Sequence, residues 1–321
     1  MKKALYFEIL HYDPSNIELL SKNYEVLTLR DPSLVDKEIL KDVTAVFAPL
    51  GYYFGAEFID LAPKLEIIAT NTTGVPHIDV DYASKRGISV ISLKGERAFL
   101  RKITPTAEFT FGLMLALIRK IPPAFNSVLE GNWNRWEFGG PKMISSMSLG
   151  IVGLGRLGTM IARYASCFGM DTAYYDPYIS PRRRSKATRV NSIAELVSTR
   201  DIITVHIPLE EKNRNFFNRE RFSCFKSNSY FINTSRGEVV DSMALLESLE
   251  SGKIAGAALD VLDGEFEPSF PGKVSNHPLV EYAGSHDNLI ITPHIAGSTR
   301  DAWFKTQRFI IEKAIGRIKT S

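Results

Sequence analysis

The sequence predicts an α/β protein built from two doubly wound parallel-sheet domains, with the second domain inserted into the first. Three observations predict this fold. Short apolar runs alternate with helical patterns over residues 1–93, the same alternation restarts near residue 148, and a glycine-rich turn that typically opens a domain stands near the middle of the 321-residue chain. Strands that alternate with helices at this spacing form parallel sheets covered by helices on both faces.

Five apolar runs are predicted to be the strands of the first domain. They read ALYFEIL, YEVLTL, TAVFAPL, LEIIATN and ISVISL. The segments between them carry helix-start signals, of which Asp13-Pro14-Ser15 and Asp31-Pro32-Ser33 are the clearest, because proline suits the first turn of a helix. We therefore expect an open sheet of about five strands.

Residues 103–121 are the most helix-like segment of this half. Thr104 is a candidate N-cap, Pro105 fits the first helical position, and Glu108 lies near the positive end of the helix dipole. A second helical stretch follows Pro122-Pro123 and ends in the aromatic cluster NWNRWEFGG. We interpret this region as a crossing between the domains.

Six further apolar runs are predicted to be strands, which is the number in a full dinucleotide-binding sheet. They read LGIVGL, DTAYYD, DIITVHIPL, SYFINTS, IAGAALDVL and NLIITP. A last helix is expected over residues 298–318, with a buried face formed by Trp303, Ile310, Ile311, Ala314 and Ile318. This helix would return to cover the first sheet. The expected domains are therefore residues 1–103 with 296–321, and residues 104–295.

Composition and charge indicate an ordinary globular protein. Hydrophobic residues make up 44% of the chain and charged residues 23%, which is the usual balance. The net charge of +3 is too small to indicate nucleic-acid binding by itself. The one dense basic run, Arg182–Arg184, is interpreted as a solvated loop.

Nothing in the sequence predicts a metal site, a disulfide or a membrane segment. Cys167 and Cys224 form no CxxC pair and no metal-ligand spacing. The apolar run at the N-terminus is interrupted by Glu8 and is too short for a signal peptide. The longest uncharged apolar segment, residues 109–118, is far shorter than a membrane span. We therefore expect a cytoplasmic protein with no metal, no membrane contact and no nucleic-acid partner.

The glycine-rich turn GLGRLG indicates a nucleotide site. Gly153 permits the tight turn, Gly155 lets the backbone approach a pyrophosphate, and Gly158 allows close packing of helix on strand. Arg156 and Leu157 then open a helix whose N-terminal N–H groups face the phosphates. Similar turns also bind flavins or S-adenosylmethionine, and some are purely structural.

Asp176 narrows the prediction to NAD. It ends the next strand, 23 residues after Gly153, which is close to the spacing of the carboxylate that binds the adenosine ribose. A carboxylate there accepts hydrogen bonds from the ribose and repels a 2′-phosphate. Arg182–Arg184 would favour NADP instead, because arginines pair with phosphates. We give Asp176 the greater weight because it stands at the strand end.

Four charged or titratable residues follow successive strands and are expected to converge at one edge of the sheet. They are Arg236, Asp260, Glu265 and His294. Arg236 offers a planar fork for a substrate carboxylate, His294 can exchange a proton with a carbonyl or hydroxyl oxygen, and Glu265 could orient the imidazole. Together with nicotinamide, these groups suit hydride exchange at a carbon next to a carboxylate.

Each of these residues also has a structural interpretation. His294 alone is more often a structural histidine, and Arg236 could form only a salt bridge at a domain interface. Glu265 could be a solvated loop carboxylate, and Asp260 could cap the loop that follows it.

Taken together, the motifs resemble the D-isomer-specific 2-hydroxyacid dehydrogenase family, which includes phosphoglycerate, D-lactate and glyoxylate-reducing enzymes. The matching pieces are GIVGLGRLG, YYDPY, VHIPL, INTSRGEVVD, GAALDVL, Glu265 and ITPHIAG, with NTTGVPHIDVDYASKRGISV and TPTAE before them. The resemblance covers essentially the whole chain. It implies a Rossmann NAD-binding domain inserted into a discontinuous, flavodoxin-like substrate domain, and an NAD-dependent oxidoreductase that acts on the CH–OH group of 2-hydroxy acids.

The resemblance also implies roles for individual residues. Arg236 would bind and polarise the 2-oxo acid, His294 would be the acid/base, and Glu265 its partner. Asp260 would lie near the nicotinamide carboxamide.

Further implied contacts concern the cofactor, the substrate and a second subunit. Thr234 and His206 would line the cofactor crevice, and the backbone N–H groups at Thr73-Gly74 would meet the substrate carboxylate. The family is typically dimeric through its cofactor domains, so the cluster NWNRWEF could belong to a homodimer interface or be buried within one subunit.

Two stretches depart from the family pattern. Glu265 and His294 are 29 residues apart, several more than in compact members, and the surplus in residues 266–288 would either shape the substrate pocket or decorate the surface. The approach to the helix at 105 is basic and contains Lys94, Arg97, Arg101 and Lys102. If some of these face the site, they would favour a large or multiply anionic substrate; ordinary solvent exposure is the alternative.

Two rival functions stay open. An NAD(H)-sensing binding protein, like the co-repressors of this family, could retain the same residues, although no long low-complexity tail is present in this sequence. A formate- or phosphite-type dehydrogenase would share the residues but need a very small pocket, which the basic segment does not favour. The individual acid, the direction of the reaction and the strictness of the preference for NAD are not predicted.

Overall fold

The computed structural model describes residues 1–179, 186–267 and 269–319, and the side chains of these residues except 318 and 319. The basic run Arg182–Arg184 therefore lies outside the described residues. The chain divides into two compact units, Met1–Ile103 with Thr299–Ser321, and Thr104–Ser298. In the described part of the chain, no helix is both long enough and apolar enough to cross a membrane.

The first unit contains one parallel sheet of five strands in the order β2-β1-β3-β4-β5. The strands are β1 (Lys3–Phe7), β2 (Glu25–Leu29), β3 (Val43–Phe47), β4 (Ile67–Ala69) and β5 (Ser89–Ile91). All five predicted strands are confirmed, although the first is shorter than expected because Glu8–Leu10 forms a 3₁₀ turn, η1.

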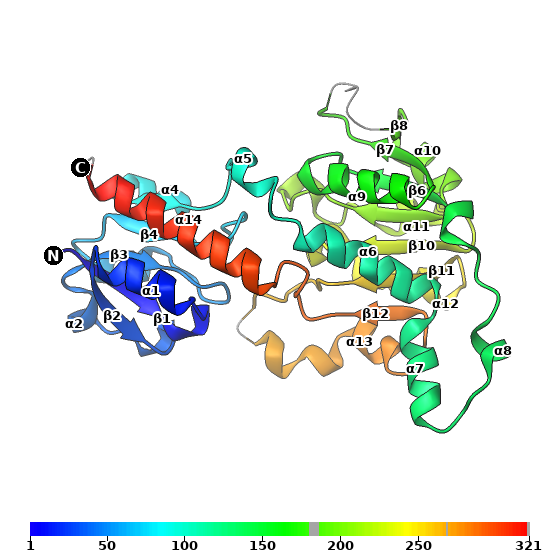
Figure 1. Ribbon diagram of the computed structural model, residues 1–321, viewed down its shortest axis with the longest axis horizontal. Coiled ribbons are helices and arrows are strands. Elements are labelled where there is room, and N and C mark those ends of the chain that lie inside the picture. The colour runs from blue at the N-terminus through cyan, green and yellow to red at the C-terminus, as the bar shows by residue number, and fades with distance from the viewer. Residues whose placement is uncertain (180–185, 268, 320–321) are drawn as a thin grey trace. The chain divides into compact units, whose positions relative to one another are not determined.

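Helices cover both faces of this sheet. They are α1 (Pro14–Ser21), η2 (Pro32–Leu34), α2 (Lys37–Leu40), α3 (Ala56–Leu61), α4 (Val80–Lys85), α5 (Arg97–Leu100) and α14 (Arg300–Lys319). One face packs on α1 and α14, which lie side by side in Figure 1, and the other face packs on α2, α3 and α4. Asp13 caps α1 as expected, because its carboxylate accepts the Ser15 N–H at 2.9 Å.

The returning helix α14 buries a stripe that differs in part from the predicted one. Ile310, Ile311 and Ala314 are fully buried against the sheet. Trp303, in contrast, is 42% exposed, so the prediction that it belongs to the buried face is wrong. At that end of the helix the buried stripe continues through small and polar residues, Ala302, Thr306 and Gln307, which an apolar pattern does not detect. The side chain of Ile318 lies outside the described residues.

Gln307 joins α14 to the start of α1. Its side-chain oxygen accepts the Asp13 N–H at 3.0 Å and the Asn16 amide at 3.2 Å. Its side-chain nitrogen donates to the His11 carbonyl at 3.4 Å. Because Gln307 is only 1% exposed, water cannot replace these bonds.

The second unit contains a parallel sheet of seven strands in the order β12-β11-β10-β9-β6-β7-β8. The strands are β6 (Ser148–Val152), β7 (Asp171–Tyr175), β8 (Thr188–Arg189), β9 (Ile202–Val205), β10 (Ser229–Asn233), β11 (Ile254–Leu259) and β12 (Leu289–Ile291). Six of them were expected, and the two-residue edge strand β8 was not. The predicted class, two doubly wound parallel-sheet domains, is confirmed.

The order in which successive strands are added to the sheet reverses at β6, which pairs in parallel with β7 on one side and with β9 on the other. Ligands of open α/β sheets bind at such a switch point, outside the carboxyl ends of the strands. The loops that follow β6, β7 and β9 are therefore the first place to look for a cofactor site.

The helices of the second unit also pack on both faces of its sheet. They are α6 (Pro105–Ile118), α7 (Ile121–Leu129), α8 (Arg135–Phe138), η3 (Ile144–Ser146), α9 (Arg156–Cys167), α10 (Ile193–Thr199), η4 (Glu211–Asn213), α11 (Arg219–Ser223), η5 (Gly237–Val239), α12 (Ser242–Glu250), η6 (Phe270–Gly272), η7 (Val274–Asn276) and α13 (Pro278–Ala283). One core lies under α6 and α9, and the other lies under α10 to α13 (Figure 1).

Two details of this unit differ from the expectations. Thr104 precedes α6 but makes no capping bond to the helix backbone; its hydroxyl donates to the Glu108 carboxylate instead. The segment 266–288, expected as a loop, folds into η6, η7 and α13, with residue 268 outside the description.

Gln307 provides a test of the return of α14. We expect Gln307→Leu to lower the free energy of unfolding by about 2–4 kcal/mol, because the partly buried Asp13 N–H and the buried Asn16 amide lose their shared acceptor. Lys305→Ala, an exposed position on the same helix, is the matched control and should change stability by less than about 0.5 kcal/mol. Urea unfolding measures both variants; an equal effect of the two would contradict the role of Gln307.

Candidate active site

Three glycines shape the turn between β6 and α9, each for a different steric reason. Gly153 has φ +91°, and a Cβ there would lie 2.8 Å from the His206 carbonyl oxygen. A Cβ on Gly158 would lie 2.1 Å from the Gly153 oxygen, so α9 packs on the turn only without a side chain. At Gly155 a Cβ would meet nothing within 4 Å, which leaves open space in front of the turn. This space lies at the positive end of α9, where a phosphate is stabilised.

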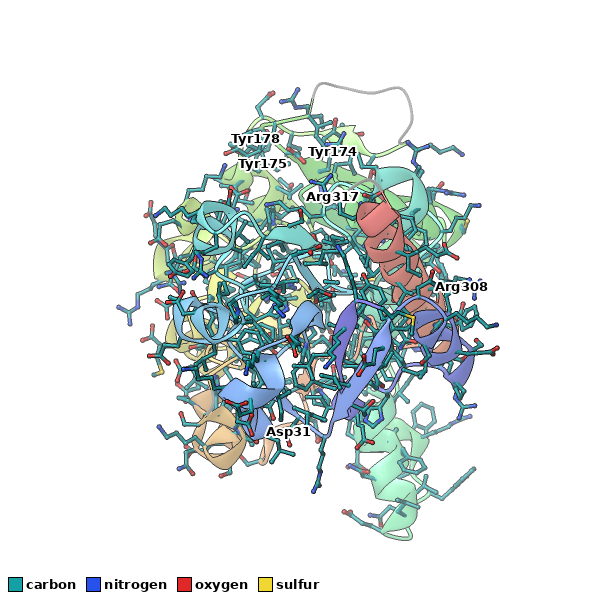
Figure 2. All side chains as sticks on the ribbon, turned by 90° about the vertical axis from the view of Figure 1, so that its left-hand side faces the viewer. Asp31, Tyr174, Tyr175, Tyr178, Arg308 and Arg317 are labelled. Atoms are coloured by element: carbon teal, nitrogen blue, oxygen red, sulfur yellow. The ribbon has the colours of Figure 1, made fainter. Side chains whose placement is uncertain are left out.

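Asp176 lies beside this turn, immediately after β7. Its carboxylate accepts the Leu154 N–H and the Tyr178 N–H, both at 2.9 Å, which leaves lone pairs for further donors. Figure 2 labels Tyr178 together with Tyr174 and Tyr175 of β7, two tyrosines that pack in the cores on opposite faces of the sheet. Arg156 and Leu157 form the first turn of α9 and are both half-buried, and burial lowers the pKa of the Arg156 guanidinium.

His206 follows β9 on the other side of the switch point. Its Nε2 lies 3.0 Å from the Thr204 hydroxyl, whereas its buried Nδ1 has no hydrogen-bond partner in the described part of the protein. Burial lowers the pKa of His206 to about 3, so the ring is neutral at physiological pH. A neutral, unpartnered ring nitrogen beside the glycine turn suits a site that a polar ligand completes.

The side chain of Thr234, expected to line the cofactor crevice, is buried. Its hydroxyl is buried 2.7 Å from that of Thr110, which in turn donates to the Thr106 carbonyl at 2.6 Å. The side chain thus connects the end of β10 to α6. The residues around the switch point nevertheless fit a dinucleotide, because the open space at Gly155, the Asp176 carboxylate and the unpartnered His206 nitrogen lie next to one turn.

The loop that carries Arg236 is built by Asn233 at the end of β10. The Asn233 oxygen accepts the Ser235 N–H at 2.9 Å and its hydroxyl at 2.7 Å, while the Asn233 nitrogen donates to the Arg236 carbonyl at 2.9 Å. The half-buried Arg236 guanidinium donates to the Ser235 carbonyl at 2.6 Å, and no described carboxylate forms an ion pair with it. Its charge is therefore available for an anion.

Gly237 brings this loop into backbone contact with the next one. A Cβ on Gly237 would lie 2.0 Å from the Leu262 carbonyl carbon and 2.2 Å from the Asp263 nitrogen. Only glycine permits this approach, because backbone atoms cannot move aside as the end of a side chain can. The loop of Arg236 and the turn that leads to Glu265 are therefore packed together.

Glu265 and His294 form a hydrogen-bonded pair. Nδ1 of His294 lies 2.9 Å from Oε1 of Glu265; the glutamate side chain is 11% exposed and the histidine side chain 32%. An ionised carboxylate accepts from Nδ1–H, which leaves Nε2 as the nitrogen that can exchange a proton. His294 has a φ of +53°, in the left-handed region, so its loop is held in a conformation that few non-glycine residues adopt.

Asp260 holds that loop in place. Its carboxylate is 1% exposed and accepts hydrogen bonds from the Thr292 hydroxyl at 2.6 Å, the Ile295 N–H at 3.0 Å and the Ala296 N–H at 2.8 Å. The Asp260 carbonyl also accepts the His294 N–H at 2.9 Å. Both carboxylate oxygens are thus used by the loop after β12, and contact with a nicotinamide carboxamide stays a prediction.

Thr73 and Gly74 belong to the first unit, where they follow β4. The Thr72 hydroxyl donates to the Gly74 carbonyl at 2.6 Å and lies 3.2 Å from the Thr70 hydroxyl, so side chains brace the turn. Within the described residues, the N–H groups of Thr73 and Gly74 donate no hydrogen bond. Two unpaired amides at the carboxyl edge of a parallel sheet can bind an anion.

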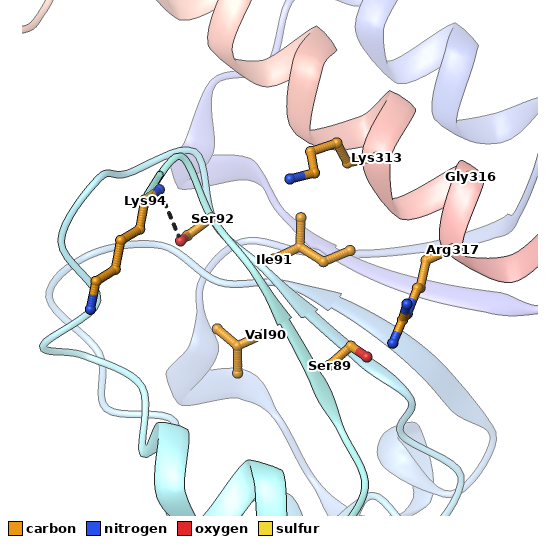
Figure 3. A pocket seen from close by; sticks show the side chains of 8 residues that line it. All are labelled: Ser89, Val90, Ile91, Ser92, Lys94, Lys313, Gly316 and Arg317. Atoms are coloured by element: carbon orange, nitrogen blue, oxygen red, sulfur yellow. Dashed lines mark hydrogen bonds between the residues drawn. The ribbon is translucent and has the colours of Figure 1, made fainter. Parts of the chain in front are cut away.

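The basic segment of the first unit is exposed. Lys94, Arg97, Arg101 and Lys102 form no ion pair with any carboxylate that the structure describes. Lys94 borders a cavity of about 500 Å³ at the edge strand β5, which is lined by Ser89, Val90, Ile91, Ser92, Lys94, Lys313, Gly316 and Arg317 (Figure 3). Lys313 is already paired with Glu96 there, and none of the predicted site residues lines this cavity.

The structure thus brings together Asp260, Glu265 and His294, and joins their turn to the Arg236 loop through Gly237. Sequence reasoning missed Asn233 and Gly237 as builders of the Arg236 loop. A signal was present for both, since an asparagine directly after a strand favours a side-chain turn and a glycine can mark a close backbone approach.

Comparison with known proteins identifies the family of the chain. Residues 111–296 match the family described as D-isomer specific 2-hydroxyacid dehydrogenase, NAD binding domain. A glyoxylate reductase of Thermofilum pendens is 37% identical over 272 residues, which cover 82% of this chain and 75% of that protein. A D-3-phosphoglycerate dehydrogenase of Methanocaldococcus jannaschii is 36% identical over 306 residues, 94% of this chain but 55% of that protein.

The chain therefore spans about half the length of the phosphoglycerate dehydrogenases that it matches. Among solved structures, a D-lactate dehydrogenase of Aquifex aeolicus in complex with NAD and lactic acid superposes with a TM-score of 0.86 at 28% identity. The superposition covers 99% of this chain and 96% of that one. The chain belongs to the D-isomer specific 2-hydroxyacid dehydrogenase family, and its second unit contains the NAD-binding domain of that family.

Proposed function

We propose that this protein is an NAD-dependent D-2-hydroxyacid dehydrogenase that also acts as a 2-oxo acid reductase. The observation that carries the proposal is the 2.9 Å hydrogen bond between Glu265 and His294, in a loop that a buried aspartate holds. In this arrangement Nδ1 of His294 is fixed by Glu265, whereas the side chain stays 32% exposed and its Nε2 can exchange a proton. A solvated glutamate and a purely structural histidine would not need such a pair.

Each residue of the site has one task in the proposed reaction. Arg236 binds the carboxylate of the 2-oxo acid and polarises its carbonyl, since its guanidinium has no carboxylate partner. The unpaired amides of Thr73 and Gly74 are proposed as a carboxylate-binding site carried by the first unit. His294 donates the proton from Nε2 to the oxygen on C2, and Glu265 stabilises the imidazolium before that transfer.

NAD binds at the switch point of the second sheet in this proposal. The N-terminus of α9 at Gly155, Arg156 and Leu157 holds the pyrophosphate, and Asp176 accepts from the adenosine ribose. His206, Thr234 and Asp260 line the remaining crevice. When bound, the reduced nicotinamide supplies the hydride for C2 of the oxo acid; in the reverse direction His294 takes the proton of the D-2-hydroxy acid.

We expect His294→Ala to lower kcat for NADH-dependent reduction of 2-oxo acids by about 10²- to 10⁴-fold, because general acid catalysis is lost. The Kd of NADH, measured by fluorescence, should be unchanged, since the hydrogen bonds of His294 are to Glu265 and to the backbone of Asp260 and Thr292. His286→Ala replaces an exposed histidine and is the matched control. Tight NADH binding without turnover of any oxo acid in a panel would contradict the proposal and favour an NAD(H)-sensing protein.

The substrate is proposed to carry a second anionic group. Four exposed cations without ion-pair partners, Lys94, Arg97, Arg101 and Lys102, stand within nine residues of the chain in the described part of the first unit. Several relatives are named D-3-phosphoglycerate dehydrogenases, whose name states a phosphorylated substrate. A phosphate group is the anion that such a set of lysines and arginines recognises most strongly.

For this proposal we expect Arg97→Ala and Arg101→Ala to lower kcat/KM about tenfold on a phosphorylated 2-oxo acid and less than about twofold on an unphosphorylated one, because a charge-assisted contact is lost. Lys85→Ala, an exposed cation on α4, is the control. Equal losses on both substrates would show that the arginines do not recognise the second anion.

A homodimer is the proposed assembly, formed through α7, α8 and the chain between them. This stretch exposes large apolar side chains at Phe125, Leu129, Trp133 and Trp136, with Trp133 89% and Trp136 77% exposed. Several large apolar side chains exposed within one short stretch favour a protein–protein contact over a solvated helix pair.

We expect the protein to sediment as a dimer and the double variant Leu129→Glu/Trp133→Glu to sediment as a monomer, because two carboxylates would be buried in the interface. Leu34→Glu, an exposed apolar position of the first unit, should leave the dimer intact. Analytical ultracentrifugation measures all three proteins. A monomeric unmodified protein, or a double variant that stays dimeric, would refute the assignment.

A further inference from the structure

The segment between Glu265 and His294 contains a second histidine–carboxylate pair. His277 precedes α13, and its Nδ1 accepts the Leu279 N–H at 3.3 Å, so the ring caps the helix. A nitrogen that accepts carries no proton, so in the neutral ring Nε2 carries the proton. Nε2 lies 3.0 Å from Oδ1 of Asp263 and donates to it.

Asp263 connects the start of α13, the start of α12 and the loop that contains Gly237. Besides His277, its Oδ1 accepts the hydroxyl of Ser242, the first residue of α12. The backbone between Leu262 and Asp263 is the one that Gly237 approaches so closely. The hydrogen bond from His277 keeps the pKa of Asp263 below its usual range against the opposing effect of burial, so the acceptor is ionised.

The turn that follows Asp263 leads directly to Glu265. Gly264 has a φ of +76°, and the Glu265 N–H reaches the Leu262 carbonyl only at 3.4 Å. Beside the turn is a cavity of about 570 Å³, lined by Glu265, Phe270 and further apolar residues of α13 and β12. Packing alone therefore leaves this side of the turn poorly supported, because empty space offers no contacts.

We propose that His277 is a positioning residue for Glu265, acting through Asp263. The His277–Asp263 bond joins two residues that are fourteen positions apart and fixes the start of the turn, so that Oε1 of Glu265 meets Nδ1 of His294. Through His277, the segment 266–288 would thus hold Glu265 in its position beside His294. This inference rests on the proposed function, in which Glu265 orients His294.

If His277 only capped α13, it would need Nδ1 but not Nε2. Substitutions can therefore separate the cap on α13 from the bond to Asp263. His277→Asn retains an oxygen that caps the helix, but its shorter side chain ends before the position of Nε2 and loses Asp263. Asp263→Asn keeps the oxygen that accepts from His277 and Ser242, whereas Asp263→Ala removes it.

The expected kinetic results follow from this separation. His277→Asn and Asp263→Ala should each lower kcat about tenfold, with KM for the oxo acid and Kd for NADH within about twofold of the unmodified protein, because Glu265 holds the imidazole less firmly. Asp263→Asn should keep kcat within about threefold. In a Glu265→Ala background, His277→Asn should have no further effect, since the residue through which it acts is gone.

A second measurement does not depend on turnover. The Nδ1 proton of His294, bound to a carboxylate, should give a slowly exchanging downfield NMR signal that His277→Asn broadens or removes and Asp263→Asn retains. If the unmodified protein reduces no oxo acid, the proposed function fails while this signal still tests the positioning role. An unchanged signal in His277→Asn, an unchanged kcat, or a loss that adds fully in the Glu265→Ala background would overturn the inference.

Discussion

The buried carboxylate of Asp260 is the interaction on which the geometry of the site depends. A charge that is 1% exposed is costly unless every oxygen is hydrogen-bonded, and here three donors, all from the segment Thr292–Ala296, satisfy it. The charge therefore fixes the end of β11 to the loop after β12. That constraint keeps His294 in the left-handed region, a conformation that a freely moving loop would leave.

Close backbone approach is the second constraint, and glycine makes it possible at two places. At Gly158 the helix that would face the phosphates packs on the turn before it, and at Gly237 the Arg236 loop packs on the backbone of the Glu265 turn. Both contacts lie at the carboxyl ends of parallel strands, where loops from neighbouring strands meet. The parallel strands place their carboxyl ends side by side. Because glycine has no side chain, the loops that follow these strands can then come into backbone contact.

The strands and the glycine-rich turn between β6 and α9 were predictable from the sequence because both depend on local pattern. Apolar runs marked eleven of the twelve strands, whereas β8 has only two exposed residues, Thr188 and Arg189, and no apolar signal. Trp303 was wrongly predicted to be buried. The buried stripe of α14 continues instead through Ala302, Thr306 and Gln307, which an apolar pattern does not detect. The partners of Asp260 and the bond from His277 to Asp263 join residues far apart in the sequence, so they depend on tertiary structure that no local pattern contains.

The length of chain between Glu265 and His294 explains why that part was hardest to predict. A longer connection costs little conformational entropy, because the cost of loop closure grows only with the logarithm of its length. Asp260 holds the His294 loop at the end of β11, five residues before Glu265, so the loops of the two residues stay near each other whatever the length of the chain between them. The intervening residues are then free to form α13 and to end in a cap that reaches Asp263. An insertion that resembles surface decoration in the sequence can in this way support the Glu265–His294 pair without changing the strands that place it.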